Sequence, residues 1–251
     1  MELELLNESS LKEFIRRLPE LSLEPPSVHL IMLAVRSRKA KQILGLKIKD
    51  LVVERKIVRP SNWRDRYFKA AYNLALLQHH GLYYYKGVKI PMEAKAIYAT
   101  LTPRSVYHAV SDLLKESVSY IFQGDESAKY QLSKLDVRFF GCLHRHKLRS
   151  KHYVTLDLDN RDKQLLKQIL DDVSMLPVFM VTETSRGYHI VLNLSNPDDA
   201  RVFYGQERLM QKLGLKYADK GLEIKRDALE PIPGTLYPRE DGSVHYVRIL
   251  I

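Results

Sequence analysis

Residues 153–159 read Tyr-Val-Thr-Leu-Asp-Leu-Asp and alternate strictly between two classes of side chain. Because successive side chains of a β-strand point to opposite faces, the aromatic, hydroxyl and carboxylate groups share one face, and the aliphatic groups share the other. Asp157 and Asp159 therefore lie about 7 Å apart along one strand face. Carboxylates at this spacing can converge on a pair of divalent cations. The alternative is a strand that simply ends in solvated acids.

The composition indicates a protein of a reducing compartment. The 251 residues include one cysteine, Cys142, which excludes a disulfide within the chain and a four-cysteine zinc site. The first ten residues are acidic and polar, unlike a secretory signal. No apolar run approaches the roughly 20 residues that span a bilayer. We therefore expect a cytoplasmic protein that does not enter a membrane.

Basic residues exceed acidic residues by 40 to 30, and the excess is concentrated in residues 36–69, which hold twelve basic and three acidic residues. A concentrated basic surface indicates a polyanion as partner. An anionic membrane surface would also fit, but no apolar helix face or lipidation motif accompanies the charge. The residues expected to contact nucleic acid are Arg36, Arg38, Lys39, Arg64 and Arg66, together with Arg145, Lys147 and Arg149 in the acid-free stretch 138–151.

Residues 1–90 are expected to form a basic, mainly helical N-terminal region. Apolar periodicity and breaker residues predict helices over 10–19, with Ser10 as the N-cap, over 27–44 and over 63–79. The segment 47–59 fits a helix or a strand equally well.

Residues 91–251 are expected to form a second unit, which begins with a strand over 97–101 and a helix over 106–119. Arg104 lies at the corner between them, where the first amide groups of the helix make a plausible phosphate site. A plain turn with a solvated arginine is the alternative. Residues 138–151 are interpreted as a basic strand or loop that lines the site. Within them, Cys142, His144 and His146 lack the fourth ligand that a structural zinc needs.

From residue 153 onward, strands and helices alternate regularly. Strands are predicted over 153–159, 177–182, 188–194, 222–224 and 244–251, and helices over 161–173 and 197–213. The order β-α-β-β-α-β is that of the split-βαβ, ferredoxin- or RRM-like arrangement, in which two helices cover one sheet face and the other is left for ligands. The predicted class is therefore α+β, with such a core, added strands and a mainly helical N-terminal region.

Three motifs lie on this pattern. They are Asp157-x-Asp159, the run Ser185-Arg186-Gly187-Tyr188-His189 that enters a strand, and Asp219 fourteen residues before Pro233-Gly234-Thr235. In this order and placement, residues of about 95–251 resemble the catalytic core of the archaeo-eukaryotic primase superfamily. That superfamily includes the small subunit of archaeal and eukaryotic primases and the primase–polymerases of plasmids and phages.

The resemblance implies a role for each motif. Asp157, Asp159 and Asp219 would be catalytic and would bind Mg²⁺ or Mn²⁺, with Glu223 and Asp227 as rivals for the third position. The nucleotide would be bound by Ser185, Arg186, His189, Arg239 and Arg104. Two positions depart from the family: Pro231 stands where an arginine is common, and Lys225 where a polar residue is. The implied partners are a single-stranded DNA template, an NTP or dNTP, and a second primase subunit or a replicative helicase.

We therefore expect a template-dependent nucleotidyltransferase that synthesises or extends primers on single-stranded nucleic acid by a two-metal mechanism. Two cations about 4 Å apart activate a 3′-hydroxyl and stabilise the pyrophosphate leaving group, and carboxylate oxygens are ligands that Mg²⁺ and Mn²⁺ prefer. A primase-like accessory subunit without turnover is one alternative, which predicts salt-sensitive binding to single strands. A metal-dependent nuclease is another, which predicts template cleavage without added nucleotide.

Overall fold

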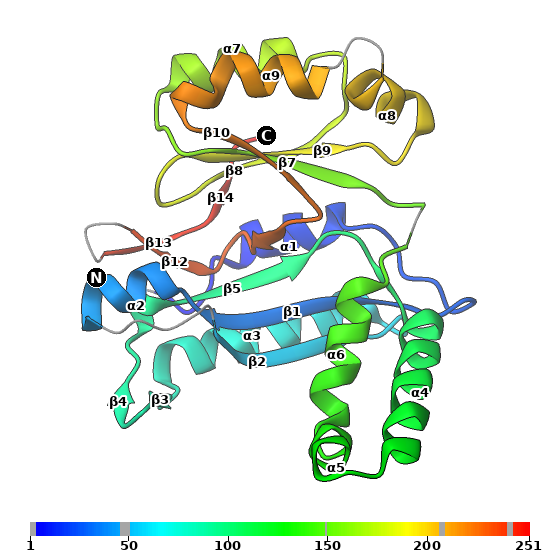
Figure 1. Ribbon diagram of the computed structural model, residues 1–251. Helices are drawn as coiled ribbons and strands as arrows, with labels where there is room; N and C mark the ends of the chain where they lie inside the picture. The colour runs from blue at the N-terminus through cyan, green and yellow to red at the C-terminus, as the bar shows by residue number, and fades with distance from the viewer. Residues whose placement is uncertain (1–3, 46–50, 149, 206–208, 240–242) are drawn as a thin grey trace.

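The structure is a computed structural model that describes residues 4–45, 51–148, 150–205, 209–239 and 243–251 (Figure 1). It is a mixed α+β protein, as the sequence predicts, with two five-stranded antiparallel sheets in separate layers. None of the described helices is both long and apolar enough to cross a membrane.

The first sheet has the strand order β11-β5-β1-β2, and β6 pairs with the start of β1. Its strands are β1 (Ser27–Val35), β2 (Leu51–Val58), β5 (Lys95–Thr100), β6 (Arg104–Ser105) and β11 (Leu229–Pro231). Helices α1 (Glu8–Arg17) and α3 (Trp63–His80) pack on the face that carries Ile31 and Leu33. The opposite face, with Met32 and Tyr98, is turned toward the second sheet.

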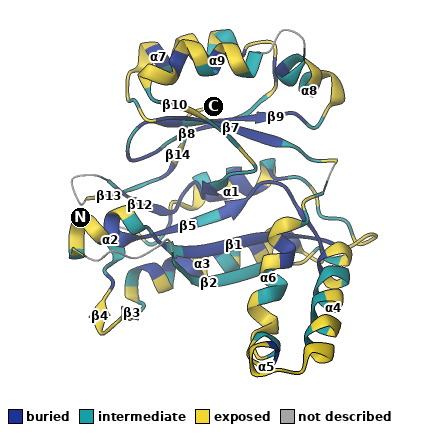
Figure 2. Ribbon diagram, in the orientation of Figure 1, coloured by how far each residue is buried: buried dark blue, intermediate teal, exposed yellow. Residues whose placement is uncertain are grey.

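The second sheet has the strand order β10-β7-β9-β8-β14. Its strands are β7 (Tyr153–Leu158), β8 (Val178–Glu183), β9 (Tyr188–Asn193), β10 (Leu222–Arg226) and β14 (Arg248–Ile249). Helices α7 (Lys163–Asp172), α8 (Pro197–Tyr204) and α9 (Leu209–Tyr217) cover its outer face (Figure 1). The strands of both sheets are mostly buried, whereas the outer sides of the helices are exposed (Figure 2).

The alternation of β7 is confirmed by its packing. Val154, Leu156 and Leu158 lie in the core under the outer helices, while Tyr153 lies in the other core, with α1 and the first sheet. Helix α1 also contacts the second sheet directly, because the Arg17 guanidinium donates to the carbonyls of Phe179 and Ile251. The odd-numbered face of β7 is therefore turned toward the first sheet.

Smaller elements surround the two sheets. They are α2 (Ser37–Leu44), the hairpin β3 (Tyr84–Tyr85) and β4 (Val88–Lys89), η1 (Met92–Ala94), α4 (Val106–Gln123), α5 (Glu126–Leu132), α6 (Leu135–Arg145), η2 (Ala218–Lys220), and the hairpin β12 (Leu236–Pro238) and β13 (Val244–Tyr246). Helices α4 to α6 project together from one end of the first sheet (Figure 1).

Several local predictions are wrong. Residues 27–35 form strand β1 rather than the first half of a helix, since the run is apolar and buried on both faces, and periodicity cannot then separate strand from helix. Residues 135–145 form helix α6, where a strand or loop was expected for 138–151. The N-cap of α1 is Asn7, whose side chain accepts from the backbone N–H of Ser10.

The two regions predicted to meet at residue 90 share the first sheet. Strand β1, from the N-terminal side of that boundary, pairs with β5 from the other side. Strand β11 then pairs with the opposite edge of β5. The segment before residue 90 therefore supplies part of one wall of the space between the two sheets.

Candidate active site between the two sheets

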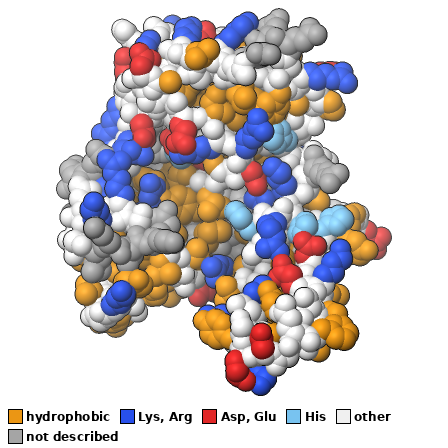
Figure 3. Space-filling view, in the orientation of Figure 1, with side chains coloured by type: hydrophobic (Ala, Val, Ile, Leu, Met, Phe, Trp, Pro, Cys, Tyr) orange, Lys and Arg blue, Asp and Glu red, His pale blue; other side chains and the backbone are white. Residues whose placement is uncertain are grey.

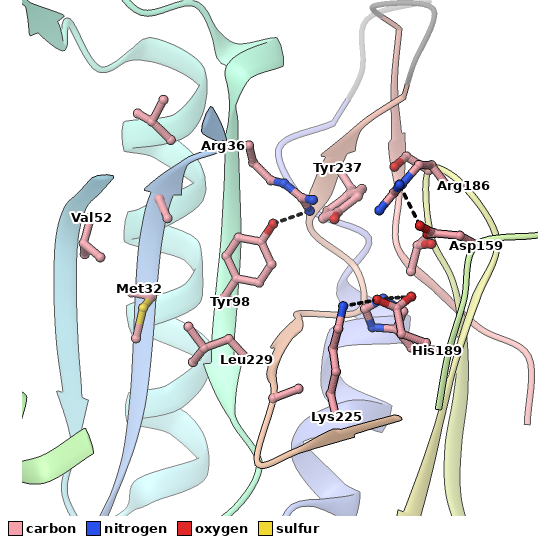
Figure 4. A pocket seen from close by; sticks show the side chains of 16 residues that line it. Met32, Arg36, Val52, Tyr98, Asp159, Arg186, His189, Lys225, Leu229 and Tyr237 are labelled. Atoms are coloured by element: carbon pink, nitrogen blue, oxygen red, sulfur yellow. Dashed lines mark hydrogen bonds and ion pairs between the residues drawn. The ribbon is translucent and has the colours of Figure 1, made fainter. Parts of the chain in front are cut away.

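A cavity of about 270 Å³ lies between the two sheets (Figure 4). The first sheet lines it with the mainly apolar side chains of Met32, Val52, Tyr98 and Leu229, and the second sheet lines it with charged groups. On the face in Figure 3 the molecule is hollowed between the layers, and Lys and Arg side chains gather at the edges of the hollow. The cavity thus has one apolar wall and one charged wall.

Asp157 lies on the charged wall and is 7% exposed. Its Oδ1 is 3.1 Å from Nε2 of His189 on β9, and its Oδ2 is 2.5 Å from Nζ of Lys225 on β10. Burial alone would raise the pKa of Asp157, but the hydrogen bonds and charges of His189 and Lys225 outweigh it and hold that pKa well below its ordinary value. Both carboxylate oxygens therefore carry negative charge and already have cationic partners.

His189 is held between two carboxylates. Its Nδ1 is 2.7 Å from Oε2 of Glu230, a fully buried residue of β11, and Thr155 donates to Oε1 of the same glutamate at 2.5 Å. Burial would lower the pKa of His189, but the charges of Glu230 and Asp157 and their hydrogen bonds raise it to about 10. The imidazole is therefore a fixed cation at neutral pH.

The stability contributed by His189 should fall as pH rises. Its folded-state pKa of about 10 lies above the unfolded value of about 6.5, so the contribution is complete below about pH 6.5 and is lost as pH rises through 10. We expect the free energy of unfolding of the wild type to approach that of His189→Gln by up to about 1.4 kcal/mol per pH unit above 6.5. Urea unfolding of both proteins at pH 6, 8 and 10, in EDTA, measures this difference, and a difference independent of pH would contradict it.

Asp159 follows the last residue of β7 and is paired with Arg186. Its Oδ2 is 2.6 Å from Nη1 of the arginine, while its backbone N–H donates to the carbonyl of Gly221 at 2.9 Å. Burial raises the pKa of Asp159, Arg186 opposes the shift, and the charge of Asp157 adds to it. The second carboxylate of the motif is thus less buried than the first and faces the same cavity.

The turn before β9 can place Arg186 next to Asp159 because the next residue, Gly187, has no side chain and packs closely against the end of β7. A Cβ on Gly187 would lie 1.8 Å from the carbonyl oxygen of Leu158 and 2.6 Å from the backbone nitrogen of Asn160. Both are backbone atoms on either side of Asp159, so neither can turn aside. The Arg-Gly pair of the motif therefore reflects close packing of this turn against the end of β7.

Gly187→Ala should push the turn away from Asp159. We expect a loss of about 1–3 kcal/mol in the free energy of unfolding, which is the usual cost of overpacking. Gly214→Ala is the matched control, because Gly214 lies in helix α9 and a Cβ added there would meet no neighbouring part of the chain within 4 Å. Alanine at that position should be neutral or stabilising. Chemical denaturation of the two variants checks the prediction, which an equal effect at both positions would refute.

Arg36 supplies a further cation from the first sheet. It follows β1, donates from Nη1 to the hydroxyl of Tyr98 at 2.6 Å, and lies 5.2 Å from the ring centroid of Tyr237. Together with Arg186, Lys225 and His189 it makes four cationic groups around the two lining carboxylates. Glu230 and Glu223 pair with two of these cations, so it is the set of cations lining the cavity, and not a net positive charge, that suits the site to phosphate oxygens.

The predicted third carboxylate is not part of this group. Asp219 is exposed in η2 and does not line the cavity. Glu223 lies opposite Asp157 in the β7–β10 pair, but its side chain is 71% exposed and pairs with Lys225. The third carboxylate near the site is Glu230, which sequence reasoning missed, and it contacts His189 rather than the cavity.

Arg104 is not available to a nucleotide, contrary to the prediction. Its side chain is fully buried and forms two hydrogen bonds with the carboxylate of Asp227, at 2.8 and 3.1 Å, and one with the carbonyl of His144. A buried guanidinium needs such partners, and here they come from the link after β10 and from α6. Arg104 therefore joins these segments.

Of the other predicted nucleotide contacts, Ser185 lines the cavity and Arg239 does not. The Arg239 carbonyl accepts a hydrogen bond from Nζ of Lys39, a mostly buried residue of α2. Lys39 therefore ties α2 to the end of β12 and is not placed as an exposed nucleic-acid contact.

The remaining basic residues fall in separate places. Arg38 is exposed on α2, next to Arg36. Arg64 and Arg66 lie on α3, which packs on the sheet face away from the cavity, and Arg64 pairs with Glu20. Arg145 pairs with Glu116 at 2.7 Å, and Lys147 is exposed beside Arg104. Arg149 lies outside the described residues.

The donor set suits a hard divalent cation. Asp157 and Asp159 offer carboxylate oxygens on one side of the cavity, and Mg²⁺ is commonly held by one or two carboxylates plus substrate phosphates. Within the described ranges, no three His, Cys, Asp or Glu side chains form a metal-binding group by themselves. A cation here would thus take the rest of its ligands from substrate and water.

No family model matches the chain, and no curated protein or solved structure matches it either.

Proposed function

We propose that this chain is a metal-dependent nucleotidyltransferase of the archaeo-eukaryotic primase type, which makes or extends primers on a single-stranded template. The observation that carries the proposal is the convergence of Asp157, Asp159, Arg186 and His189 on one cavity, from the end of β7 and from strand β9 with the turn before it. A family resemblance read from short motifs would not by itself require these side chains to meet.

The topology of the second sheet also supports the proposal. The strand order is β10-β7-β9-β8. Helix α7 connects β7 to β8, and helices α8 and α9 lie between β9 and β10. This is the order expected of a split-βαβ core. In that arrangement the helices cover one face and the ligand occupies the other. Here the face opposite the outer helices, which is turned toward the first sheet, carries Asp157 and His189.

Asp157 and Asp159 would hold Mg²⁺ or Mn²⁺, and the bound cation would lower the pKa of a 3′-hydroxyl and neutralise charge on the transferred phosphate. Arg186 and Lys225, which pair with the two carboxylates, and Arg36 from the opposite wall would bind phosphate oxygens. His189 would add a fixed positive charge. The apolar wall of the first sheet would accommodate base and sugar.

A second candidate is a primase-like accessory protein that binds nucleotide or single strands without turnover. The observation that favours it is that each carboxylate already has a cation of the protein as partner, Lys225 and His189 for Asp157 and Arg186 for Asp159. A metal must compete with these ion pairs. The two candidates share the polyphosphate site and differ in catalysis.

The deciding experiment is a primer-synthesis and primer-extension assay with the purified protein. A single-stranded template is incubated with labelled NTPs or dNTPs and with Mg²⁺ or Mn²⁺, and products are resolved by length. We expect a ladder of products that EDTA abolishes. Nucleotide binding without any product at millimolar Mg²⁺ or Mn²⁺ would instead support the accessory role, and template cleavage without nucleotide would support a nuclease.

A further inference from the structure

The β3–β4 hairpin is a small projection beside α2, at the end of the molecule opposite helices α4 to α6 (Figure 1). Its sequence from residue 82 to 89 is Leu-Tyr-Tyr-Tyr-Lys-Gly-Val-Lys, which combines three tyrosines with two lysines. The candidate active site does not use any of these residues.

The tyrosines have two different environments. Tyr83 and Tyr85 are partly buried and pack against a cluster that includes Val35 and Ala40, so they fix the hairpin to β1 and α2. Because side chains alternate along a strand, Tyr84 points away from that cluster, and it is 56% exposed. The hairpin therefore presents an exposed aromatic ring on a support that its neighbours hold in place.

The turn of the hairpin is unusual in carrying a lysine. Lys86 has φ of 50° and Gly87 has φ of 78°, and such two-residue turns favour Asn-Gly or Asp-Gly because both positions need positive φ. A lysine at the first position is conformationally less suited than asparagine, yet it places an exposed cation at the tip. A residue kept in a disfavoured conformation is a reason to look for a function at that place.

The hairpin and helix α2 carry basic but no acidic side chains, and the acid that follows the hairpin in the chain is Glu93 of η1. Residues 81–92 and 37–45 contain no acidic residue. Arg38 and Lys41 are exposed on α2, the helix that follows Arg36 and packs in the same cluster as Tyr83 and Tyr85 of the hairpin. Exposed cations therefore stand on two neighbouring elements, α2 and the hairpin, beyond the cavity.

We propose that the β3–β4 hairpin is a contact surface for single-stranded nucleic acid, in which a base stacks on Tyr84 and the lysines contact the phosphates on either side. Aromatic rings flanked by cations are the usual means of binding unpaired strands without sequence preference. The basic charge of residues 81–92 and of α2, neither of which contains an acid, favours this polyanion as the occupant. The choice of single-stranded nucleic acid as the ligand rests on the proposed function, but binding of a strand to the hairpin does not require catalytic turnover.

The test is fluorescence anisotropy with labelled single-stranded oligonucleotides, in EDTA and without nucleotide. Tyr84→Ala should weaken binding by about fivefold or more, the usual effect of losing one stacked base. Lys86→Asn keeps a residue that tolerates positive φ, and should reduce the slope of log affinity against log salt by about 0.7. Tyr84→Ala should not reduce the affinity for a blunt duplex by a comparable factor, because the bases of a duplex are already stacked on one another.

Tyr130→Ala is the matched control. Tyr130 on α5 is, like Tyr84, 56% exposed and has a lysine nearby, Lys134 at 3.9 Å from its ring centroid, but it lies on the projecting helices at the other end. Unchanged binding by Tyr84→Ala, or an equal loss in Tyr130→Ala, would overturn the proposal. Tyr84-dependent binding to anionic vesicles, without binding to oligonucleotides, would overturn it in favour of a lipid surface.

The outcome separates the hairpin from the catalytic proposal. Loss of binding in Tyr84→Ala by a protein that never incorporates nucleotide would keep the hairpin surface and refute nucleotidyl transfer. Incorporation by a protein whose binding is insensitive to Tyr84 and Lys86 would do the reverse.

Discussion

The double variant Asp157→Ala, Asp159→Ala is expected to lose primer extension by at least about 10³-fold. A bound cation supplies several kcal/mol of charge stabilisation in the transition state, and each 1.36 kcal/mol corresponds to a factor of ten in rate. Both carboxylates line the cavity, and no other acid among the described residues does so. The measurement is product formed per minute on a primed single-stranded template at saturating Mg²⁺ or Mn²⁺.

Two further variants make this result interpretable. Asp157→Asn keeps the shape of a residue that is only 7% exposed, so its loss of activity would not reflect a cavity left in the strand. Asp219→Ala removes the exposed acid that the family resemblance places in the metal site, and we expect it to keep activity within about twofold of the wild type, as expected for a surface substitution away from the chemistry. An inactive Asp219→Ala beside an active Asp157→Asn would show that the site has been assigned to the wrong acids.

Glu230→Ala is expected to lower the free energy of unfolding by about 3–5 kcal/mol. Removing one partner of a buried ion pair leaves the other charge without compensation, which is far costlier than the pair is worth. Glu230 is fully buried, accepts from Thr155 and lies 2.7 Å from Nδ1 of His189. Urea unfolding at pH 7 measures the loss.

Glu223→Ala is the control for this effect. Glu223 also pairs with a cation near the site, Lys225, but its side chain is 71% exposed, and exposed pairs contribute about 1 kcal/mol or less. Glu230→Gln adds a second measurement, because it keeps the size of the side chain and removes the charge that raises the pKa of His189. A His189 pKa in Glu230→Gln equal to that of the wild type, measured by NMR titration, would show that Glu230 does not hold the imidazolium.

The sequence predicts β7 well because its environment has two different faces. Val154 and Leu156 meet the outer helices while Thr155 and Asp157 meet the first sheet, so a period of two is visible in the sequence. Strand β1 is buried on both faces, against α1 and α3 on one and, at Val28 and Leu30, against α4 and α6 on the other, so its apolar run carries no such period. The wall of the cavity that β1 provides was therefore missed.

The residues of the charged wall could be predicted only where they belong to a motif of a few consecutive residues. Asp157 and Asp159, and the turn with Arg186 and Gly187, are each contained within a few residues. Glu230 and Lys225 act through contacts that no spacing reveals, with side chains of β7 and β9 about 40 to 70 positions away. Lys225 stands out in the sequence only because the primase pattern that the chain resembles has a different polar residue at this position. In the structure its ammonium group pairs with Asp157.

The link between β10 and β11 determines the directions in which the side chains of Lys225 and Glu230 point. Lys225 and Glu230 are five positions apart, so in an unbroken extended strand their side chains would point to opposite sides. Asp227, between them, has φ of 54° and is fixed by Arg104, and the change of direction there lets both residues face β7 and β9. Adding or removing one residue in this link would turn the Glu230 carboxylate away from the His189 imidazole. An insertion or deletion in this link should therefore disturb the site more than one in an exposed loop elsewhere on the surface.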